Sequence, residues 1–154
     1  MFMQTNPFRP PISESPPEPG DVLSKPVFIG VSIGAGAAYI AMSLSGLAFV
    51  WYLSLSGTPM ADLYRRAYAS VPYLLFAHAE GFASMAIGGY WAARTAERRA
   101  GLAALIAGAI YALFVLLQYS TPYSWPIPFW SRALSVVLPL PGYLLGARFA
   151  SRPS

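Results

Sequence analysis

The sequence predicts an all-α integral membrane protein, a four-helix bundle with an N-terminal disordered tail. Of the 154 residues, 56% are hydrophobic and only 10% are charged, which is too apolar for an ordinary soluble domain of this length. The apolar residues also occur in blocks of roughly 15 to 29 residues, not in short amphipathic stripes. The cations stand at the ends of these blocks, as in membrane proteins. Lipid is therefore expected to surround much of the chain.

Residues 1–25 are predicted to form a disordered, proline-rich cytoplasmic tail. This segment has few large apolar residues and cannot bury a core. Two Pro-Pro pairs could dock into an aromatic groove of a partner, but a solvated leader is the favoured interpretation. The prolines of the tail are Pro7, Pro10, Pro11, Pro16, Pro17 and Pro19.

Residues 26–150 are predicted to form a transmembrane domain with spans at about 27–55, 71–93, 101–119 and 131–148. The first span would reach about 43 Å, more than the roughly 30 Å hydrocarbon core, so we expect it to tilt or protrude. The uncharged part of the last block gives only about 22 Å of helix, and it spans only if Arg132 and Arg148 snorkel. Residues 56–70 are predicted to be a polar link, and 119–130 an uncharged interfacial hairpin.

The distribution of Lys and Arg predicts that both termini are cytoplasmic. Nine of the ten cations are Arg, and Ala and Gly are abundant, a composition that indicates a bacterial protein and hence the inner membrane. With the N-terminus inside, seven cations are cytoplasmic and three are outside, as the positive-inside rule requires. The inside group is Arg9, Lys25, Arg94, Arg98, Arg99, Arg148 and Arg152, and the outside group is Arg65, Arg66 and Arg132.

Glu80 is the most informative residue, because a carboxylate near the middle of a span costs about 2.5 to 3.5 kcal/mol to insert. One interpretation makes Glu80 a proton-titrating or cation-binding site, helped by Gln118, Tyr39 or Tyr111. The favoured alternative makes it a hydrogen-bonding link between helices, with His78 near the outer interface in a similar role. His78 is two residues from Glu80, about 200° around a helix, so the two side chains are predicted to face opposite sides and to form no dyad.

Pro139 and Pro141 predict a break in the last span. They remove two backbone donors and bias Leu140 away from helical geometry. Such breaks can line binding sites in transporters, although a simple kink is the favoured interpretation because membrane helices tolerate proline. Small residues at four-residue spacing, such as Gly30 and Gly34, predict close helix packing.

The segment Gly88-Gly89-Tyr90-Trp91-Ala92-Ala93-Arg94, followed by a short charged loop and Ala100-Gly101-Leu102, resembles small four-helix integral membrane proteins of bacteria. The resemblance covers the second and third predicted spans. It implies the four-helix architecture, and it implies neither an activity nor any functional residues.

No catalytic residue, cofactor or metal site is predicted. The chain has no cysteine and one histidine, which leaves no ligand set for thiolate or His-rich metal sites, and no nucleotide-binding or nucleophile motif occurs. No basic stripe suggests nucleic acid. The expected function is a non-catalytic structural, accessory or partner-binding subunit in the lipid bilayer with a membrane partner protein, whereas a homo-oligomer is expected for the alternative. The alternative is a small proton- or cation-linked transporter or channel component that uses Glu80.

Overall fold

The computed structural model describes residues 25–55, 57, 59–120 and 127–151, and 94% of these residues are helical, with no strand among them. This confirms the predicted all-α class. The predicted tail before Lys25 and positions 121–126 of the predicted hairpin lie outside the described residues. The elements are α1 (Lys25–Leu55), α2 (Met60–Ala69), α3 (Val71–Ala96), the 3-10 turn η1 (Glu97–Arg99), α4 (Ala100–Ser120), α5 (Phe129–Val137) and α6 (Pro139–Ala150).

Among the described residues, three helical stretches are long and apolar enough to cross a membrane: α1, α4 and the consecutive pair α5–α6, which covers Phe129–Ala150. The last stretch has 22 residues, about 33 Å of helix, so it is longer than its uncharged part alone suggested. α3 has 26 residues but is not among the three. We attribute this to its polar residues, including His78 and Glu80, which lower its mean hydropathy.

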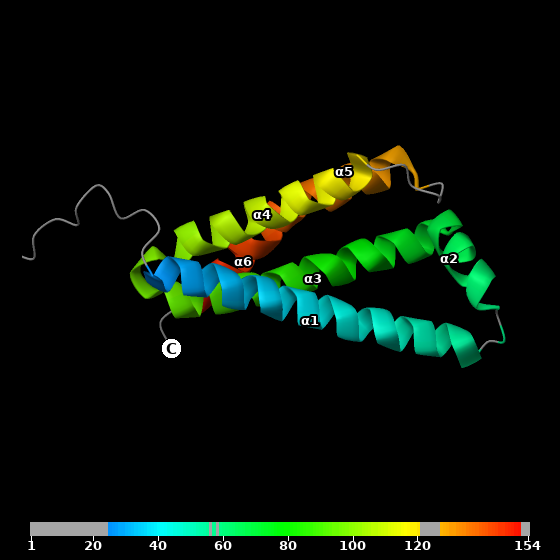
Figure 1. Ribbon diagram of the computed structural model, residues 1–154, viewed down its shortest axis with the longest axis horizontal. Coiled ribbons are helices and arrows are strands. Elements are labelled where there is room, and N and C mark those ends of the chain that lie inside the picture. The colour runs from blue at the N-terminus through cyan, green and yellow to red at the C-terminus, as the bar shows by residue number, and fades with distance from the viewer. Residues whose placement is uncertain (1–24, 56, 58, 121–126, 152–154) are drawn as a thin grey trace, which may run out of the picture.

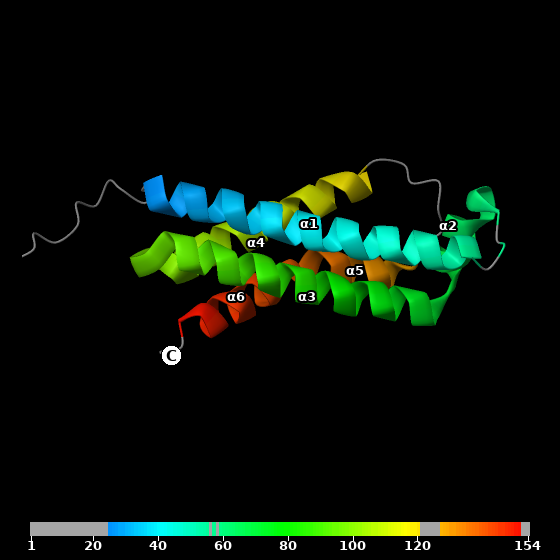
Figure 2. The same cartoon turned by 90° about the horizontal axis from the view of Figure 1, so that it is seen from below.

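The helices form an elongated bundle in which α1, α3, α4 and the consecutive pair α5–α6 run in alternating directions (Figures 1 and 2). The start of α1, the α3–α4 junction and the end of α6 lie at one end, which we call the closed end. α2 lies at the opposite end, which we call the open end, across the ends of α1 and α3 (Figure 1). α3 packs most extensively against α1 and α6, so it is the central helix of the bundle.

Glycine and alanine bring the helix backbones together toward the closed end. A Cβ added to Gly34 would lie 2.6 Å from the Gly88 carbonyl oxygen, and one added to Gly89 would overlap the backbone carbonyl of Tyr143. The same holds for Gly146 against the carbonyl of Ala86. No side chain larger than hydrogen fits at these crossings, and this is how small residues let helices approach closely in lipid.

Leu138 separates α5 from α6. Pro139 is the first residue of α6, where its missing N–H removes no bond within that helix. The Leu138 N–H donates to the Leu134 carbonyl at 2.9 Å, and the Gly142 N–H donates to the Leu138 carbonyl at 3.1 Å. Leu140 lies inside α6, so the expectation that it departs from helical geometry is wrong. The helical hydrogen bonds that continue around Leu138 explain why the interruption is so short.

The predicted polar link contains the amphipathic helix α2, which the sequence analysis missed. Leu63 and Ala67 are four residues apart and both are buried, whereas Arg65 and Arg66 are exposed. That spacing is one face of a helix, and it is the signal that could have found α2.

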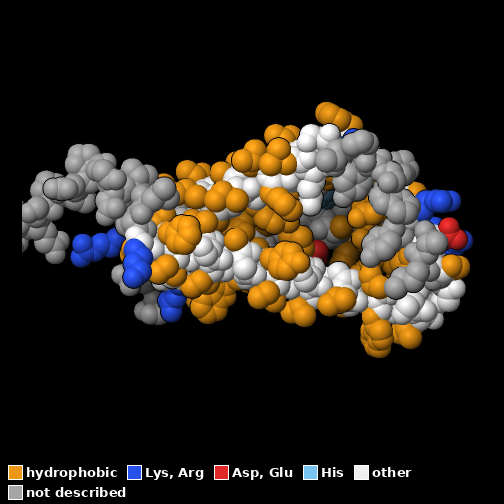
Figure 3. All heavy atoms as spheres, viewed as in Figure 1, with side chains coloured by type: hydrophobic (Ala, Val, Ile, Leu, Met, Phe, Trp, Pro, Cys, Tyr) orange, Lys and Arg blue, Asp and Glu red, His pale blue; other side chains and the backbone are white. Residues whose placement is uncertain are grey.

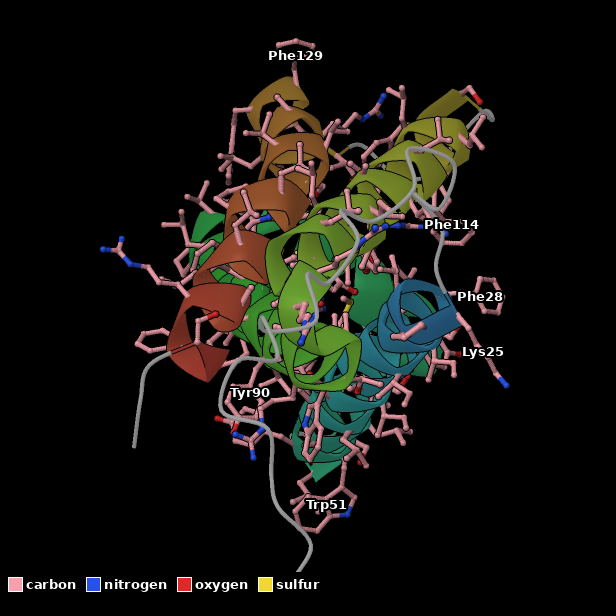
Figure 4. The ribbon with its side chains drawn as sticks, turned by 90° about the vertical axis from the view of Figure 1, so that its left-hand side faces the viewer. Lys25, Phe28, Trp51, Tyr90, Phe114 and Phe129 are labelled. Atoms are coloured by element: carbon pink, nitrogen blue, oxygen red, sulfur yellow. The ribbon has the colours of Figure 1, made fainter. Side chains whose placement is uncertain are left out.

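Apolar side chains cover the outside of the bundle between two charged ends (Figure 3). Phe28 and Trp51 of α1, Phe114 of α4 and Phe129 of α5 project away from the bundle (Figure 4), and each is more than half exposed. At most 33% of each apolar membrane-length stretch is buried within the chain. Contiguous apolar surface of this extent is typical of proteins that contact lipid or other proteins.

Candidate functional site

A cavity of about 280 Å³ lies among α1, α3, α4 and α5, and it collects the polar side chains of the middle of the bundle. Glu80, His78 and Gln118, the three residues of the polar site predicted from the sequence, all line it. The space-filling view shows an acidic side chain within a hollow of the otherwise apolar middle (Figure 3). The remaining polar lining residues are Tyr68, Tyr111, Tyr119, Ser131 and Ser135.

Glu80 links α3 to α1. Its Oε1 atom accepts hydrogen bonds from the Ser45 hydroxyl of α1 and, at 3.0 Å, from the Ser84 hydroxyl one turn along α3. Ser45 Oγ also lies 2.9 Å from the Met42 carbonyl oxygen. A serine hydroxyl has one hydrogen, so Ser45 cannot donate to both acceptors at once. If Glu80 carried a proton, it could donate to Ser45, and Ser45 could then donate to Met42.

His78 links α3 to α5 on the other side of the cavity. Its Nε2 lies 2.9 Å from Ser131 Oγ, and its ring centroid is 5.8 Å from that of Trp130. Ser131 is buried. The next turn of α5 continues the polar contacts, because the Ser135 hydroxyl accepts a hydrogen bond of 3.1 Å from the Tyr119 hydroxyl of α4.

The two residues thus reach partners on different helices, α1 for Glu80 and α5 for His78. This agrees with the 200° between them along α3. What the helical angle did not reveal is that both side chains border the same cavity. A single space between the helices therefore holds one carboxyl and one imidazole.

Tyr111 of α4 borders the same cavity, and its hydroxyl donates to the Met42 sulfur at 3.1 Å. Tyr143 of α6 is fully buried, and no described residue hydrogen-bonds its hydroxyl. Tyr39, a suggested helper of Glu80, is 71% exposed on α1 and does not line the cavity. Of the two tyrosines considered from the sequence, only Tyr111 belongs to the site.

Sequence reasoning expected a Ser or Tyr partner for Glu80, but it did not identify which serines complete the site. Ser45 follows Ala37 and Ala41 at four-residue spacing, a pattern that predicts close packing of helices. Ser131 and Ser135 lie one turn apart on α5. Single serines in an apolar helix carry little signal, because they also bond their own backbone, as Ser135 does to the Ser131 carbonyl at 3.0 Å.

Within the described residues no group of three or more His, Cys, Asp or Glu side chains lies close enough to hold a metal ion. The cavity offers one carboxyl, one imidazole, hydroxyls and an amide. This set can bind a proton, a small cation or a hydrogen-bonding group of a partner.

The chain matches no protein-family model, no curated protein and no solved structure at a significant level.

Proposed function

We propose that the chain is a multi-pass protein of the bacterial inner membrane and that α3 is a fourth span beside α1, α4 and α5–α6. α3 has more buried residues than any other described helix, and it packs against α1, α4 and α6. A helix enclosed by other helices can carry polar residues that would be unfavourable in contact with lipid.

The charges at the two ends support cytoplasmic termini. Lys25, Arg94, Arg98, Arg99 and Arg148 belong to the closed end, and Arg65, Arg66 and Arg132 to the open end, so the cation-rich end faces the cytoplasm. Reporter fusions after Ser154 and after Gly57 test this topology. We expect a reporter that works only outside to be active after Gly57 and inactive after Ser154, and activity after Ser154 would refute the four-span topology.

In this setting the protein acts as a non-catalytic accessory or partner-binding subunit. One observation carries the proposal: the polar cavity is confined to one part of the bundle, and its lining includes none of the glycines at which the helix backbones meet toward the closed end. A single copy therefore offers a binding site without a route through the bundle. The exposed apolar surface provides area for a membrane partner.

Native mass spectrometry of the protein extracted gently from its own membrane tests this role. We expect a complex of fixed stoichiometry with another chain. A homo-oligomer that retains no partner chain would contradict the accessory role and favour the second candidate.

The second candidate is a proton- or cation-linked transporter or channel component, favoured by the Ser45–Glu80–Ser84 contacts. These hydrogen bonds can be satisfied with Glu80 ionised or with Glu80 carrying a proton, because the Ser45 hydroxyl can change its acceptor. A carboxyl that has partners in both states is suited to proton exchange.

Ion flux into liposomes that contain the purified protein tests this candidate. Glu80→Gln keeps the size and the hydrogen bonds but cannot change charge, so it should abolish a pH-dependent flux. His78→Gln, on the opposite side of the cavity, is the matched control and should reduce the flux less. Wild-type flux equal to that of empty liposomes, or full flux in both variants, would reject the candidate.

A further inference from the structure

A second and larger recess lies at the open end, between the end of α1, α2 and the start of α3. Its volume is about 620 Å³, and most of its lining is apolar or aromatic. Phe49 of α1 and Tyr73 of α3 form part of its wall, with ring centroids 4.6 Å apart. This recess, which we call the α2 groove, shares no lining residue with the cavity that Glu80 and His78 border, although Ser45, which hydrogen-bonds Glu80, lines the groove.

One cation borders this apolar space. Arg66 lies in the last turn of α2, is exposed and lines the groove. Ala67 beside it is buried, so the orientation of α2 places the guanidinium at the groove. Within the described part of the chain, Arg66 forms no ion pair. An unpaired guanidinium beside an apolar recess complements a molecule with an anionic head and an apolar chain.

We infer that the α2 groove binds an anionic phospholipid of the surrounding bilayer, with an acyl chain along Phe49, Tyr73 and Phe76 and its phosphate at Arg66. The inference rests on the proposed membrane location, which the topology reporters test independently. A guanidinium can bind two phosphate oxygens at once, so Arg66 at the edge of the groove matches the phosphate of a lipid headgroup.

The position of the groove in the bundle supports a lipid. Trp51 and Tyr52, at the end of α1, are each 68% exposed, and exposed aromatic residues of this kind mark the headgroup level of a bilayer. Tyr52 itself lines the groove. A phosphate at Arg66 would therefore lie at the depth where lipid headgroups lie, with the acyl chain directed toward the middle of the bundle.

The test uses the full-length purified chain in detergent with equal amounts of phosphatidylglycerol and phosphatidylcholine that carry identical acyl chains. Native mass spectrometry then counts each retained lipid. The wild-type protein should retain phosphatidylglycerol preferentially. Arg66→Gln should lower that preference roughly fivefold, whereas Arg65→Gln should not, because Arg65 is exposed on the same helix but does not line the groove.

A second pair of variants tests the acyl chain site without changing charge. Ala48→Trp fills the groove from an exposed lining position and should reduce retention of both lipids, whereas Ala109→Trp, at an exposed position of α4 outside the groove, should leave retention unchanged. Equal retention of the two lipids by the wild-type protein, or equal losses in Arg65→Gln and Arg66→Gln, would overturn the inference. A dimer that Ala48→Trp dissociates without altering lipid retention would assign the groove to a second copy of the chain and overturn it too.

Discussion

The two ends of the bundle are held together in different ways. Toward the closed end, backbones meet directly, as where Gly34 faces Gly88 and where Gly89 faces Tyr143. Toward the open end, side chains such as Phe49, Tyr73 and Trp130 lie between the helices, and the contacts between helices include hydrogen bonds of Glu80 and His78. The comparison teaches that residue size decides where this bundle can have a cavity.

This contrast follows from the physics of association in lipid. Apolar side chains gain little by leaving lipid for a protein interior, so close packing and hydrogen bonds between helices must hold such a bundle together. Glycine allows the closest packing of helices, and polar side chains supply the hydrogen bonds between them. The closed end depends mainly on packing, and the open end combines packing with polar contacts around a space.

The largest expected effect is at the closed end. Gly89→Ala places a methyl group against the backbone carbonyl of Tyr143, which cannot move without displacing α6. We expect a loss of about 2 to 3 kcal/mol in the free energy of unfolding, measured by titration with a denaturing detergent.

Gly81→Ala is the matched control on the same helix, because nothing lies within 4 Å of its added Cβ. Alanine favours helix over glycine, so this variant should be neutral or more stable by up to about 1 kcal/mol. Equal losses in the two variants would show that the closed end is not held by backbone contact.

The next effect is at the open end, where Glu80→Ala removes the acceptor shared by Ser45 and Ser84. We expect a loss of about 1 to 2 kcal/mol, since hydrogen bonds between membrane helices average about 0.6 kcal/mol and reach about 1.7 kcal/mol. A double-mutant cycle of Glu80→Ala with Ser45→Ala should give a coupling energy of about 1 kcal/mol. A coupling energy of zero would mean that Glu80 does not join α1 to α3.

A smaller effect is expected for the contact between α3 and α5. Ser131→Ala removes the partner of the His78 Nε2 atom and should lower the free energy of unfolding by about 0.6 kcal/mol. Ser120→Ala is a suitable control, because among the described residues its exposed hydroxyl bonds only the Leu117 carbonyl of its own helix. If both variants lose the same amount, the His78–Ser131 contact does not join α3 to α5.

Much of the fold could be predicted from the sequence because long apolar blocks with charged ends mark helices directly. The predicted spans 71–93 and 101–119 correspond to α3 (Val71–Ala96) and α4 (Ala100–Ser120) within three residues. The short helix α2 was missed, because ten residues with two adjacent arginines resemble a polar link when no apolar block marks them.

The site could be predicted only in part. Glu80 and His78 stand out because polar residues in apolar helices are unfavourable unless they have partners. The partners themselves depend on the rotation and crossing of helices far apart in the sequence. Ser45 and Glu80 are 35 positions apart and His78 and Ser131 are 53 apart, and neither separation carries a local pattern.

The smallest expected effect tests whether the polar contacts of the open end extend into the closely packed core. Tyr143 is fully buried among the small residues of that core, and its hydroxyl has no hydrogen-bond partner among the described residues. Tyr143→Phe keeps the ring and removes only this hydroxyl, so the free energy of unfolding should change by less than about 0.5 kcal/mol and can increase, since an unpartnered buried polar group is unfavourable.

Tyr111→Phe is the matched comparison, because its hydroxyl contacts the Met42 sulfur, and it should lose slightly more. A loss above about 1 kcal/mol in Tyr143→Phe would mean that the hydroxyl has a bound partner, and the two ends would then share one polar network instead of being held together in different ways.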